Sequence, residues 1–194
     1  MNRVAVIVAG GSGTRMGNDL PKQFLKLKGR EILLHSVDAF INAYADVKII
    51  LVLPKDYISF TKVLIGEQNY PTTIDVVEGG ATRFDSVKNG LQAVKEPGVI
   101  FVHDGVRCLV SSDLIKKCYE EALVHGSAIP AVTATDSIRL ISGETHHVVD
   151  RNLVKIIQTP QTFLSSVLLP AFEQPYQASF TDEATVVEAA GHTV

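Results

Sequence analysis

The sequence is poor in the residues that mark metal-binding and disulfide-rich proteins. Its 194 residues include only two cysteines, Cys108 and Cys118, and no Cys-x-x-Cys pair. The six histidines do not stand at metal-ligand spacing from either cysteine. We therefore expect no zinc site and no disulfide framework, and we interpret the two thiols as small apolar packing residues in a reducing compartment.

Long hydrophobic runs and a strong excess of one charge are also missing. The apolar stretch 4–9 is too short for the hydrophobic region of a signal peptide, and no apolar run is long enough to span a membrane. The formal net charge is -3, and 46% of the residues are hydrophobic. We therefore expect one cytoplasmic globular domain over 1–194 that binds neither nucleic acid nor membrane.

Short apolar runs rich in β-branched residues recur along the chain and predict buried strands. Such runs lie at 4–8, 48–53 and 99–102, with weaker ones at 73–77 and at 128–132, where Pro130 favours an edge or a bend. Apolar residues recur at helical spacing within 33–44, 84–94 and 114–122. This alternation predicts an α/β fold, with a mostly parallel sheet between helices and ligands at the carboxyl ends of its strands.

The pattern changes between residues 133 and 155. Two short apolar segments, 138–141 and 147–149, flank a Ser142-Gly143 turn and predict a β-hairpin. The segment has too few apolar residues for a core of its own, and an isolated hairpin is marginally stable in water. We therefore expect 133–155 to be a projecting arm that packs on a second subunit in a homodimer.

A glycine-rich loop follows the first predicted strand. It reads Ala9-Gly-Gly-Ser-Gly-Thr-Arg-Met-Gly17 and is followed by Pro21-Lys-Gln23. Such a loop lets backbone N–H groups hold phosphate oxygens, with Arg15 and Lys22 as nearby cations. It matches neither the dinucleotide fingerprint nor the Walker A pattern. The alternative is a flexible surface loop, but its place after a buried strand favours a phosphate site.

Polar residues also follow two later strands. His103, Asp104 and Arg107 end the strand at 99–102, where an aspartate can hold a divalent cation or a substrate hydroxyl. For His103 the simpler interpretation is a hydrogen-bonded buried histidine. Gly79-Gly80 with Arg83 and Ser86 follow the strand at 73–77 and could equally form an ordinary turn with capping residues. The Thr181-Asp-Glu183 segment has the pattern of a helix N-cap.

Taken in order, these segments resemble the 2-C-methyl-D-erythritol 4-phosphate cytidylyltransferase family. The matching motifs are the loop from Ala9 with Pro21-Lys-Gln23, His103-Asp104 with Arg107, Asp150-Arg-Asn152, Thr159-Pro-Gln161 and Thr181-Asp-Glu-Ala184. The resemblance covers the whole chain and implies a Rossmann-like fold of the nucleotide-diphospho-sugar transferase type. It also implies transfer of a cytidylyl group from CTP to 2-C-methyl-D-erythritol 4-phosphate, with release of pyrophosphate, in non-mevalonate isoprenoid biosynthesis.

The resemblance further implies roles for individual residues. The nucleotide would be held by Ala9, Gly10, Gly11, Ser12, Gly13, Gly79, Gly80, Arg83, Ser86 and Gly105, with Arg15 and Lys22 as the catalytic cations. The polyol phosphate would meet Asp104, Arg107, Arg151, Thr159 and Thr181, with Arg151 reaching the partner subunit's site through the arm. Mg²⁺ would be held mainly by the nucleotide phosphates, with help from Asp104.

The chain departs from the family at several positions. Gly105-Val-Arg-Cys108 stands where the family usually has Ala-Ala-Arg-Pro, and Ala81 stands where an acidic residue is common. Family members continue beyond the position of Val194 with an Asn-Ile-Lys segment, which we expect to be missing from this chain.

Two alternative functions remain open at this point. Ribitol-5-phosphate cytidylyltransferase shares several of the motifs, but the Asp150-Arg-Asn152 triplet favours the methylerythritol enzyme. A non-catalytic nucleotide-binding module is the other, and it would not need both Arg15 and Lys22.

Overall fold

The computed structural model describes residues 1–10 and 20–194. Its main sheet contains β1 (Asn2–Val8), β4 (Lys48–Leu53), β5 (Ile74–Glu78), β6 (Gly98–Asp104), β7 (Ser127–Ala128) and β12 (Gln161–Leu164). The helices are α1 (Ile32–Ala43), α2 (Ile58–Gly66), α3 (Arg83–Gln92), α4 (Ser112–His125), α5 (Ser165–Ala171) and α6 (Glu183–Ala189). Shorter elements are η2 (Lys22–Phe24), β2 (Lys26–Leu27) and β3 (Arg30–Glu31) before α1, and η3 (Lys55–Tyr57) after β4.

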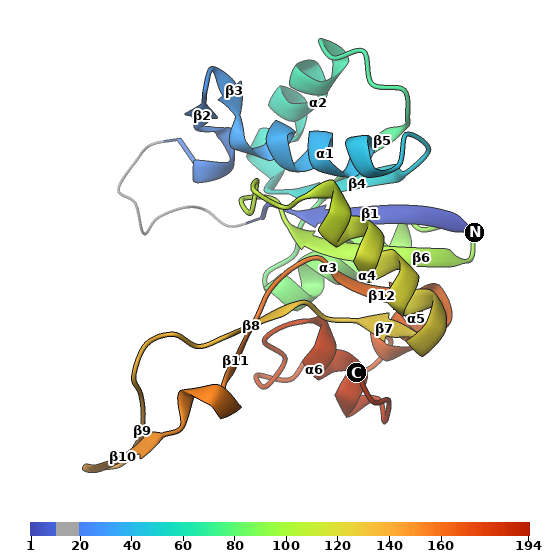
Figure 1. The fold of residues 1–194 in the computed structure, drawn as a ribbon. Helices are drawn as coiled ribbons and strands as arrows, with labels where there is room; N and C mark the ends of the chain where they lie inside the picture. Colours follow the sequence, from blue (N-terminus) through green and yellow to red (C-terminus); the bar gives the residue numbers. More distant parts are fainter. Residues whose placement is uncertain (11–19) are drawn as a thin grey trace.

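The main sheet has the strand order β5-β4-β1-β6-β12-β7 (Figure 1). The first four of these strands are parallel, whereas β12 runs antiparallel to both β6 and β7. The expected mostly parallel sheet is therefore confirmed. Its parallel part places the carboxyl ends of β1, β4, β5 and β6 along one edge, which is where ligands of such sheets bind.

Helices cover both faces of the sheet, so its central strands are apolar on both sides. In β1, Ala5 and Ile7 pack with α1 and α4 in one core. Val4 and Val6 point to the other face and pack with α3, α5 and α6 in a second core. This alternation explains why the strand reads as an unbroken apolar run. No helix in the described part of the chain is long and apolar enough to cross a membrane.

Local sequence signals set the ends of α4 and α6. Ser111 caps α4 by accepting a hydrogen bond from the Leu114 amide, and Gly126 ends that helix with a φ of 88°. Asp182 caps α6 in a reciprocal capping box with Thr185, as the helix-start pattern at 181–183 predicted.

The structure differs from the sequence-based expectation at two places between residues 127 and 164. The single strand expected at 128–132 is split at Pro130 into β7, on the sheet edge, and β8 (Ala131–Thr133). The main sheet also includes β12, which the local pattern did not predict, because Gln161 and Thr162 are polar although both are buried.

The expected hairpin is present as a projecting arm (Figure 1). Its elements are β8, β9 (Ile138–Ser142), β10 (Thr145–Val149), η4 (Arg151–Leu153) and β11 (Lys155–Ile157). Strands β8 and β11 pair at its root, and β9 and β10 pair beyond them. Leu140, Ile141 and Val148 on the arm are exposed.

Candidate active site

Two neighbouring cavities lie at the carboxyl edge of the parallel strands. The larger has a volume of about 520 Å³ and the smaller about 190 Å³. The larger is lined by Val8, Ala9, Gly10, Lys22, Gln23, Gly80, Ala81, Thr82, Arg83, Ser86, Asp104 and Val106. The smaller is lined by Arg83, Asp104, Arg107, Ile157, Gln158, Thr159, Gln161, Thr181 and Asp182. Arg83 and Asp104 line both cavities and so form a shared wall.

The loop between β5 and α3 closes one side of the larger cavity. The Ser86 hydroxyl accepts a hydrogen bond from the Gly80 amide at 3.0 Å and donates one to the Thr82 carbonyl oxygen at 2.9 Å. Thr82 and Asp85 form a capping box that begins α3. A Cβ atom added at Gly80 would lie 2.2 Å from the Asp85 Cβ, so the tight turn requires glycine there.

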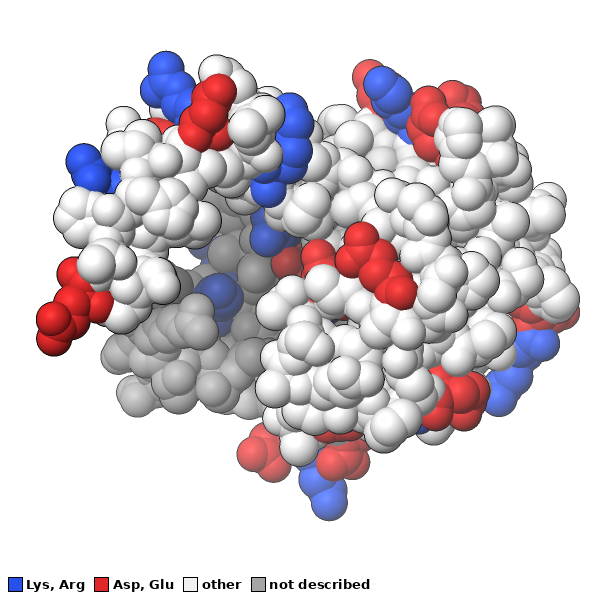
Figure 2. All heavy atoms as spheres, turned by 90° about the horizontal axis from the view of Figure 1, so that it is seen from below, with Lys and Arg blue, Asp and Glu red and all other residues white. Residues whose placement is uncertain are grey.

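Another part of the wall of the larger cavity is formed by the end of β1 and by η2. The Ala9 carbonyl oxygen accepts a hydrogen bond from Gln23 Nε2 at 2.7 Å, and Gln23 is buried. This contact fixes η2 beside the strand end, which places Lys22 at the cavity. Seen from below, the surface is hollowed, and basic and acidic side chains meet in the hollow (Figure 2).

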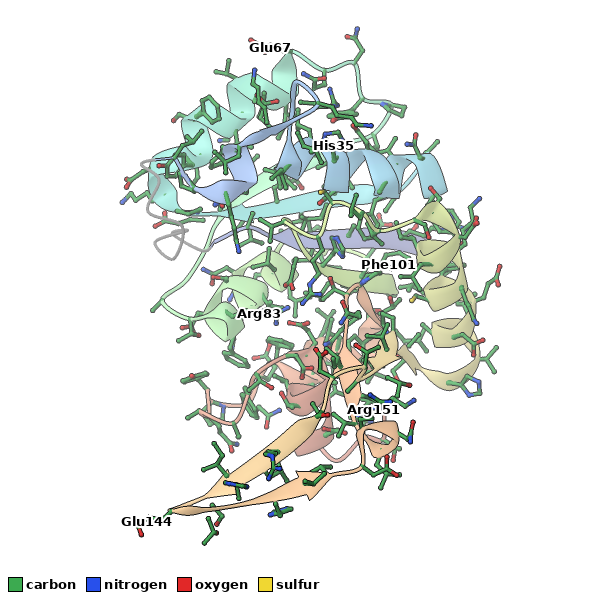
Figure 3. All side chains as sticks on the ribbon, turned by 60° about the vertical axis from the view of Figure 1, so that its left-hand side comes forward. His35, Glu67, Arg83, Phe101, Glu144 and Arg151 are labelled. Carbon is green, nitrogen blue, oxygen red and sulfur yellow. The ribbon has the colours of Figure 1, made fainter. Side chains whose placement is uncertain are left out.

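Asp104 lies between two guanidinium groups at the shared wall. Its Oδ1 accepts a hydrogen bond from Arg83 Nη2 at 3.2 Å, and its Oδ2 accepts one from Arg107 Nε at 2.7 Å. Arg107 also donates from Nη1 to Gln158 Oε1 at 2.7 Å, which fixes its direction towards the smaller cavity. Arg83, in the first turn of α3 (Figure 3), pairs in addition with both carboxylate oxygens of Glu183.

The charges of this cluster stabilise one another. Burial alone would raise the pKa of Asp104, but Arg83 and Arg107 outweigh it and hold that pKa below its ordinary value. Burial likewise opposes the charged form of Arg83, but the Glu183 and Asp104 carboxylates raise its pKa above the usual range. Asp104 is therefore an ionised carboxylate and Arg83 a cation at neutral pH.

The arrangement suits anions better than a metal ion. Both carboxylate oxygens of Asp104 already accept hydrogen bonds from arginines. Within residues 1–10 and 20–194, no group of three or more His, Cys, Asp or Glu side chains is gathered as metal ligands. The described residues therefore offer no cluster that could hold a metal by protein side chains alone, and the role of Asp104 as a metal ligand stays a prediction.

His103 forms hydrogen bonds that fix the turn after β6. Its Nε2 lies 3.2 Å from the Arg107 carbonyl oxygen, so Nε2 carries the proton, because a carbonyl can only accept. Its Nδ1 then accepts from the Thr159 hydroxyl at 2.9 Å, and that hydroxyl accepts from the Asp104 amide. Complete burial lowers the pKa of His103 to about 4. The interpretation of His103 as a hydrogen-bonded buried histidine fits these contacts.

The structure brings together most of the predicted site residues that it describes. Ala9, Gly10, Lys22, Gly80, Arg83 and Ser86 line the larger cavity, and Asp104, Arg107, Thr159 and Thr181 line the smaller. Gly79 and Gly105 lie outside both linings, and a Cβ at either position would come within 3.0 Å of a neighbouring side chain. Gly11, Ser12, Gly13 and Arg15 lie outside the described residues.

Arg151 does not line either cavity of its own chain. It lies at the root of the arm, with Glu144 at the tip (Figure 3), and donates a hydrogen bond to the Thr135 carbonyl oxygen at 2.7 Å. Its side chain is exposed. A role for Arg151 in the partner's site therefore stays a prediction.

Sequence reasoning assigned no site role to Gln158 or Glu183. Glu183 reads as an ordinary acidic residue in the first turn of a helix, and nothing in the local pattern shows that it is buried opposite Arg83. Its only sequence signal is its place in the Thr181-Asp-Glu-Ala184 motif.

A cavity of about 720 Å³ lies elsewhere, between α4 and the β7–β8 segment. None of the predicted site residues lines it, and it lies away from the carboxyl ends of the parallel strands. The paired cavities are therefore the better candidate for the active site, although neither is as large.

Comparisons with known proteins agree on one family. A sequence model of 2-C-methyl-D-erythritol 4-phosphate cytidylyltransferase matches residues 3–194. The enzyme of that name from Bacteroides thetaiotaomicron is 44% identical over 191 residues, which is 98% of this chain and 87% of the relative. The one from Phocaeicola vulgatus is 43% identical over 194 residues, which is all of this chain and 89% of the relative.

Solved structures give the same result. The Francisella tularensis 2-C-methyl-D-erythritol 4-phosphate cytidylyltransferase has a TM-score of 0.78 and 30% identity, over all of this chain and 88% of the other. A bifunctional enzyme from Campylobacter jejuni has a TM-score of 0.82 and 27% identity. In that case the match covers 98% of this chain but 48% of the other.

Proposed function

The chain belongs to the 2-C-methyl-D-erythritol 4-phosphate cytidylyltransferase family, and we propose that CTP and the polyol phosphate react at its two neighbouring cavities. The reaction transfers a cytidylyl group from CTP to 2-C-methyl-D-erythritol 4-phosphate, in non-mevalonate isoprenoid biosynthesis. It gives 4-diphosphocytidyl-2-C-methyl-D-erythritol and pyrophosphate. The observation that carries the placement is the wall of Arg83 and Asp104 that both cavities share.

The nucleotide would occupy the larger cavity and the polyol phosphate the smaller. The larger has the glycines, Ser86 and Lys22 that suit a nucleotide triphosphate, and the smaller has Arg107, whose planar guanidinium can grip a phosphate through two hydrogen bonds. Asp104 and Thr181 can accept hydrogen bonds from the polyol hydroxyls. The two reacting groups would then meet beside Arg83.

The chemistry needs positioning and charge neutralisation rather than a general base. The phosphate of the polyol substrate is already an anion at neutral pH and attacks the α-phosphorus of CTP directly. Negative charge on the transferred group and on the departing pyrophosphate would be stabilised by Lys22 and by Arg15, which lies outside the described residues. This explains why the described site contains cations and backbone amides and why its buried histidine is committed to structural contacts.

Several further features are part of the same proposal. A divalent cation, by preference Mg²⁺, would arrive bound to the CTP phosphates, where it would neutralise charge, with Asp104 as the proposed protein contact. Residues 1–194 would act as one nucleotidyltransferase domain in a homodimer built through the arm at 133–155. The enzyme would work in the cytoplasm, where CTP is available and where Cys108 and Cys118 remain thiols.

A pyrophosphate-release assay tests this function. The chain is incubated with CTP and either 2-C-methyl-D-erythritol 4-phosphate or ribitol 5-phosphate, with each substrate omitted in turn. We expect release only when CTP and the methylerythritol phosphate are both present. A faster rate with ribitol 5-phosphate would assign the chain to the alternative reaction, and nucleotide binding without release would make it a binding module.

A further inference from the structure

Glu183 is a buried carboxylate that reaches the active site through another residue. It is 1% exposed and lies in the first turn of α6, 100 residues after Arg83. Its two oxygens accept hydrogen bonds from Nη1 and Nη2 of Arg83, and the Nη2 atom also donates to Asp104. A charge so deeply buried needs a partner, because the cost of removing it from water is otherwise uncompensated.

The position of Glu183 is itself fixed by the sheet. Buried Gln161, on β12, donates from Nε2 to Asp182 at 3.0 Å and accepts from the Ala184 amide at 2.8 Å. These two bonds tie the first turn of α6 to β12. Strand β12 pairs with β6, and β6 ends at Asp104. Glu183 therefore acts as a rigid anchor on the guanidinium of Arg83.

Arg83 needs such an anchor because it lies between the two cavities. Lys22 lines only the larger cavity and Arg107 only the smaller, whereas Arg83 lines both. A long arginine side chain without a buried partner would have many rotamers and would turn towards either substrate phosphate. Bound to Glu183, it instead remains in the wall and holds one oxygen of Asp104.

We propose that Glu183 is a positioning residue of the cytidylyl transfer, which acts through Arg83 to hold the wall between the nucleotide and polyol phosphate sites. The inference rests on the proposed assignment of the two cavities. The alternative is that the ion pair of Glu183 with Arg83 only holds α3 and α6 together. A structural pair would affect the stability of the fold and leave the kinetic constants of the folded enzyme unchanged.

The test compares Glu183→Gln with Glu31→Gln in the full chain. Glu31 is the matched control, because it is also a buried carboxylate paired with a cation, Lys26 at 3.4 Å, but lines neither cavity. Thermal unfolding gives the stability of each protein, and steady-state kinetics are measured with each substrate varied in turn. We expect Glu183→Gln to lower kcat about 10-fold to 100-fold, the scale of an approximately 1 Å misplacement in an active site. Glu31→Gln should keep the parent kinetics.

Two more proteins test whether Glu183 acts through Arg83. Arg83→Lys should reduce kcat/KM for CTP and for the polyol phosphate by similar factors, because the wall serves both sites. In the Arg83→Lys background, adding Glu183→Gln should lower kcat no further, since the residue through which it acts is already changed. If Glu183→Gln does not fold, the Arg83→Lys kinetics still test whether Arg83 serves both substrate sites.

Failure of the positioning role can be told apart from failure of the proposed cytidylyl transfer. If the unchanged chain does not release pyrophosphate from CTP and the methylerythritol phosphate, the proposed function fails. If the unchanged chain is active and folded Glu183→Gln keeps its kcat and both KM values, the positioning role is wrong. Arg83→Lys kinetics that match those of the unchanged chain, or additive losses in the double variant, would also overturn it.

Discussion

Lys22 is held at the larger cavity by the contacts of η2, in which its neighbour Gln23 is bound to the end of β1. The buried amide of Gln23 holds the Ala9 carbonyl, and Lys22 lies next to it in η2. A cation placed at this cavity can stabilise charge that develops on the phosphates.

We therefore predict that Lys22→Ala lowers kcat by about 100-fold to 1000-fold, the usual effect of losing one preorganised charge-stabilising group. Steady-state pyrophosphate release measures it. Lys26→Ala is the control, since Lys26 has the same charge four residues later and lines neither cavity. Equal turnover in folded Lys22→Ala and the parent would remove Lys22 from the mechanism.

His103 couples the stability of the fold to pH. Its pKa is about 4 in the folded chain and 6.5 when unperturbed, so between these values the unfolded chain binds a proton that the folded chain does not. The stabilisation is fully present above pH 6.5 and is lost as the pH falls towards 4. The full loss corresponds to about 3 kcal/mol.

The measurement compares the free energy of unfolding of the parent with that of His103→Gln between pH 7 and pH 4. We expect the advantage of the parent to shrink by about 3 kcal/mol over this range. Burial also raises the pKa of Glu183, whereas Arg83 and Arg107 hold that of Asp104 below its ordinary value. Both carboxylates are present in the parent and in His103→Gln, so their effect on the difference in free energy of unfolding is reduced. A constant difference would show that His103 does not titrate as described.

At the scale of elements, the β5–α3 turn shapes the larger cavity through Gly80. Gly80→Ala would force the new Cβ against Asp85, whose carboxylate accepts hydrogen bonds from Thr82 in the capping box. We predict a loss of about 1–3 kcal/mol in the free energy of unfolding, the usual cost of an overpacked site. The loss should come with a higher KM for CTP.

Gly66→Ala is the control for this change. Gly66 ends α2, and an added Cβ there would meet nothing within 4 Å. Alanine is the better helix residue, so the control should be neutral or slightly stabilised. Chemical denaturation gives the free energy of unfolding of the parent, Gly80→Ala and Gly66→Ala. Equal stability of Gly80→Ala and the parent would contradict the close contact at Gly80.

The elements that could be predicted are those whose signal is local. Strand β4 was predicted with its observed bounds, because a strand covered on both faces must be apolar throughout. Strand β12 was missed because its pairing partners, β6 and β7, lie far along the chain and because buried Gln161 reads as a loop residue. The contact between Glu183 and Arg83 could not be predicted either, because the two residues lie 100 positions apart in the chain. A charged residue is normally exposed, and only its partner makes burial possible.

At the scale of the whole molecule, the arm decides whether an active site belongs to one chain or to two. The arm leaves the body of the molecule, its apolar residues Leu140, Ile141 and Val148 are exposed, and Arg151 lies at its root away from both cavities. These observations support the proposed homodimer, in which Arg151 serves the neighbouring site.

A complementation experiment tests this geometry. Lys22→Ala and Arg151→Ala proteins are mixed under conditions in which subunits exchange. In a mixed dimer, one site combines the intact Lys22 of one chain with the intact Arg151 of the other, and the second site carries both changes. Each mixed dimer therefore has one intact site instead of two. We expect its activity to rise on mixing to about half that of a parent dimer. No rise despite demonstrated exchange would place both residues in the same chain's site.

If the arm donates Arg151 to a neighbour, as proposed, catalysis would also depend on protein concentration. Each molecule on its own would lack part of its substrate grip, so the rate per molecule would follow the fraction of paired molecules. On serial dilution, specific activity should stay constant down to the dissociation constant of the dimer and then fall, without any loss of folded protein. In a cell, the amount of enzyme made would therefore set both the number of active sites and the proportion of chains that can work.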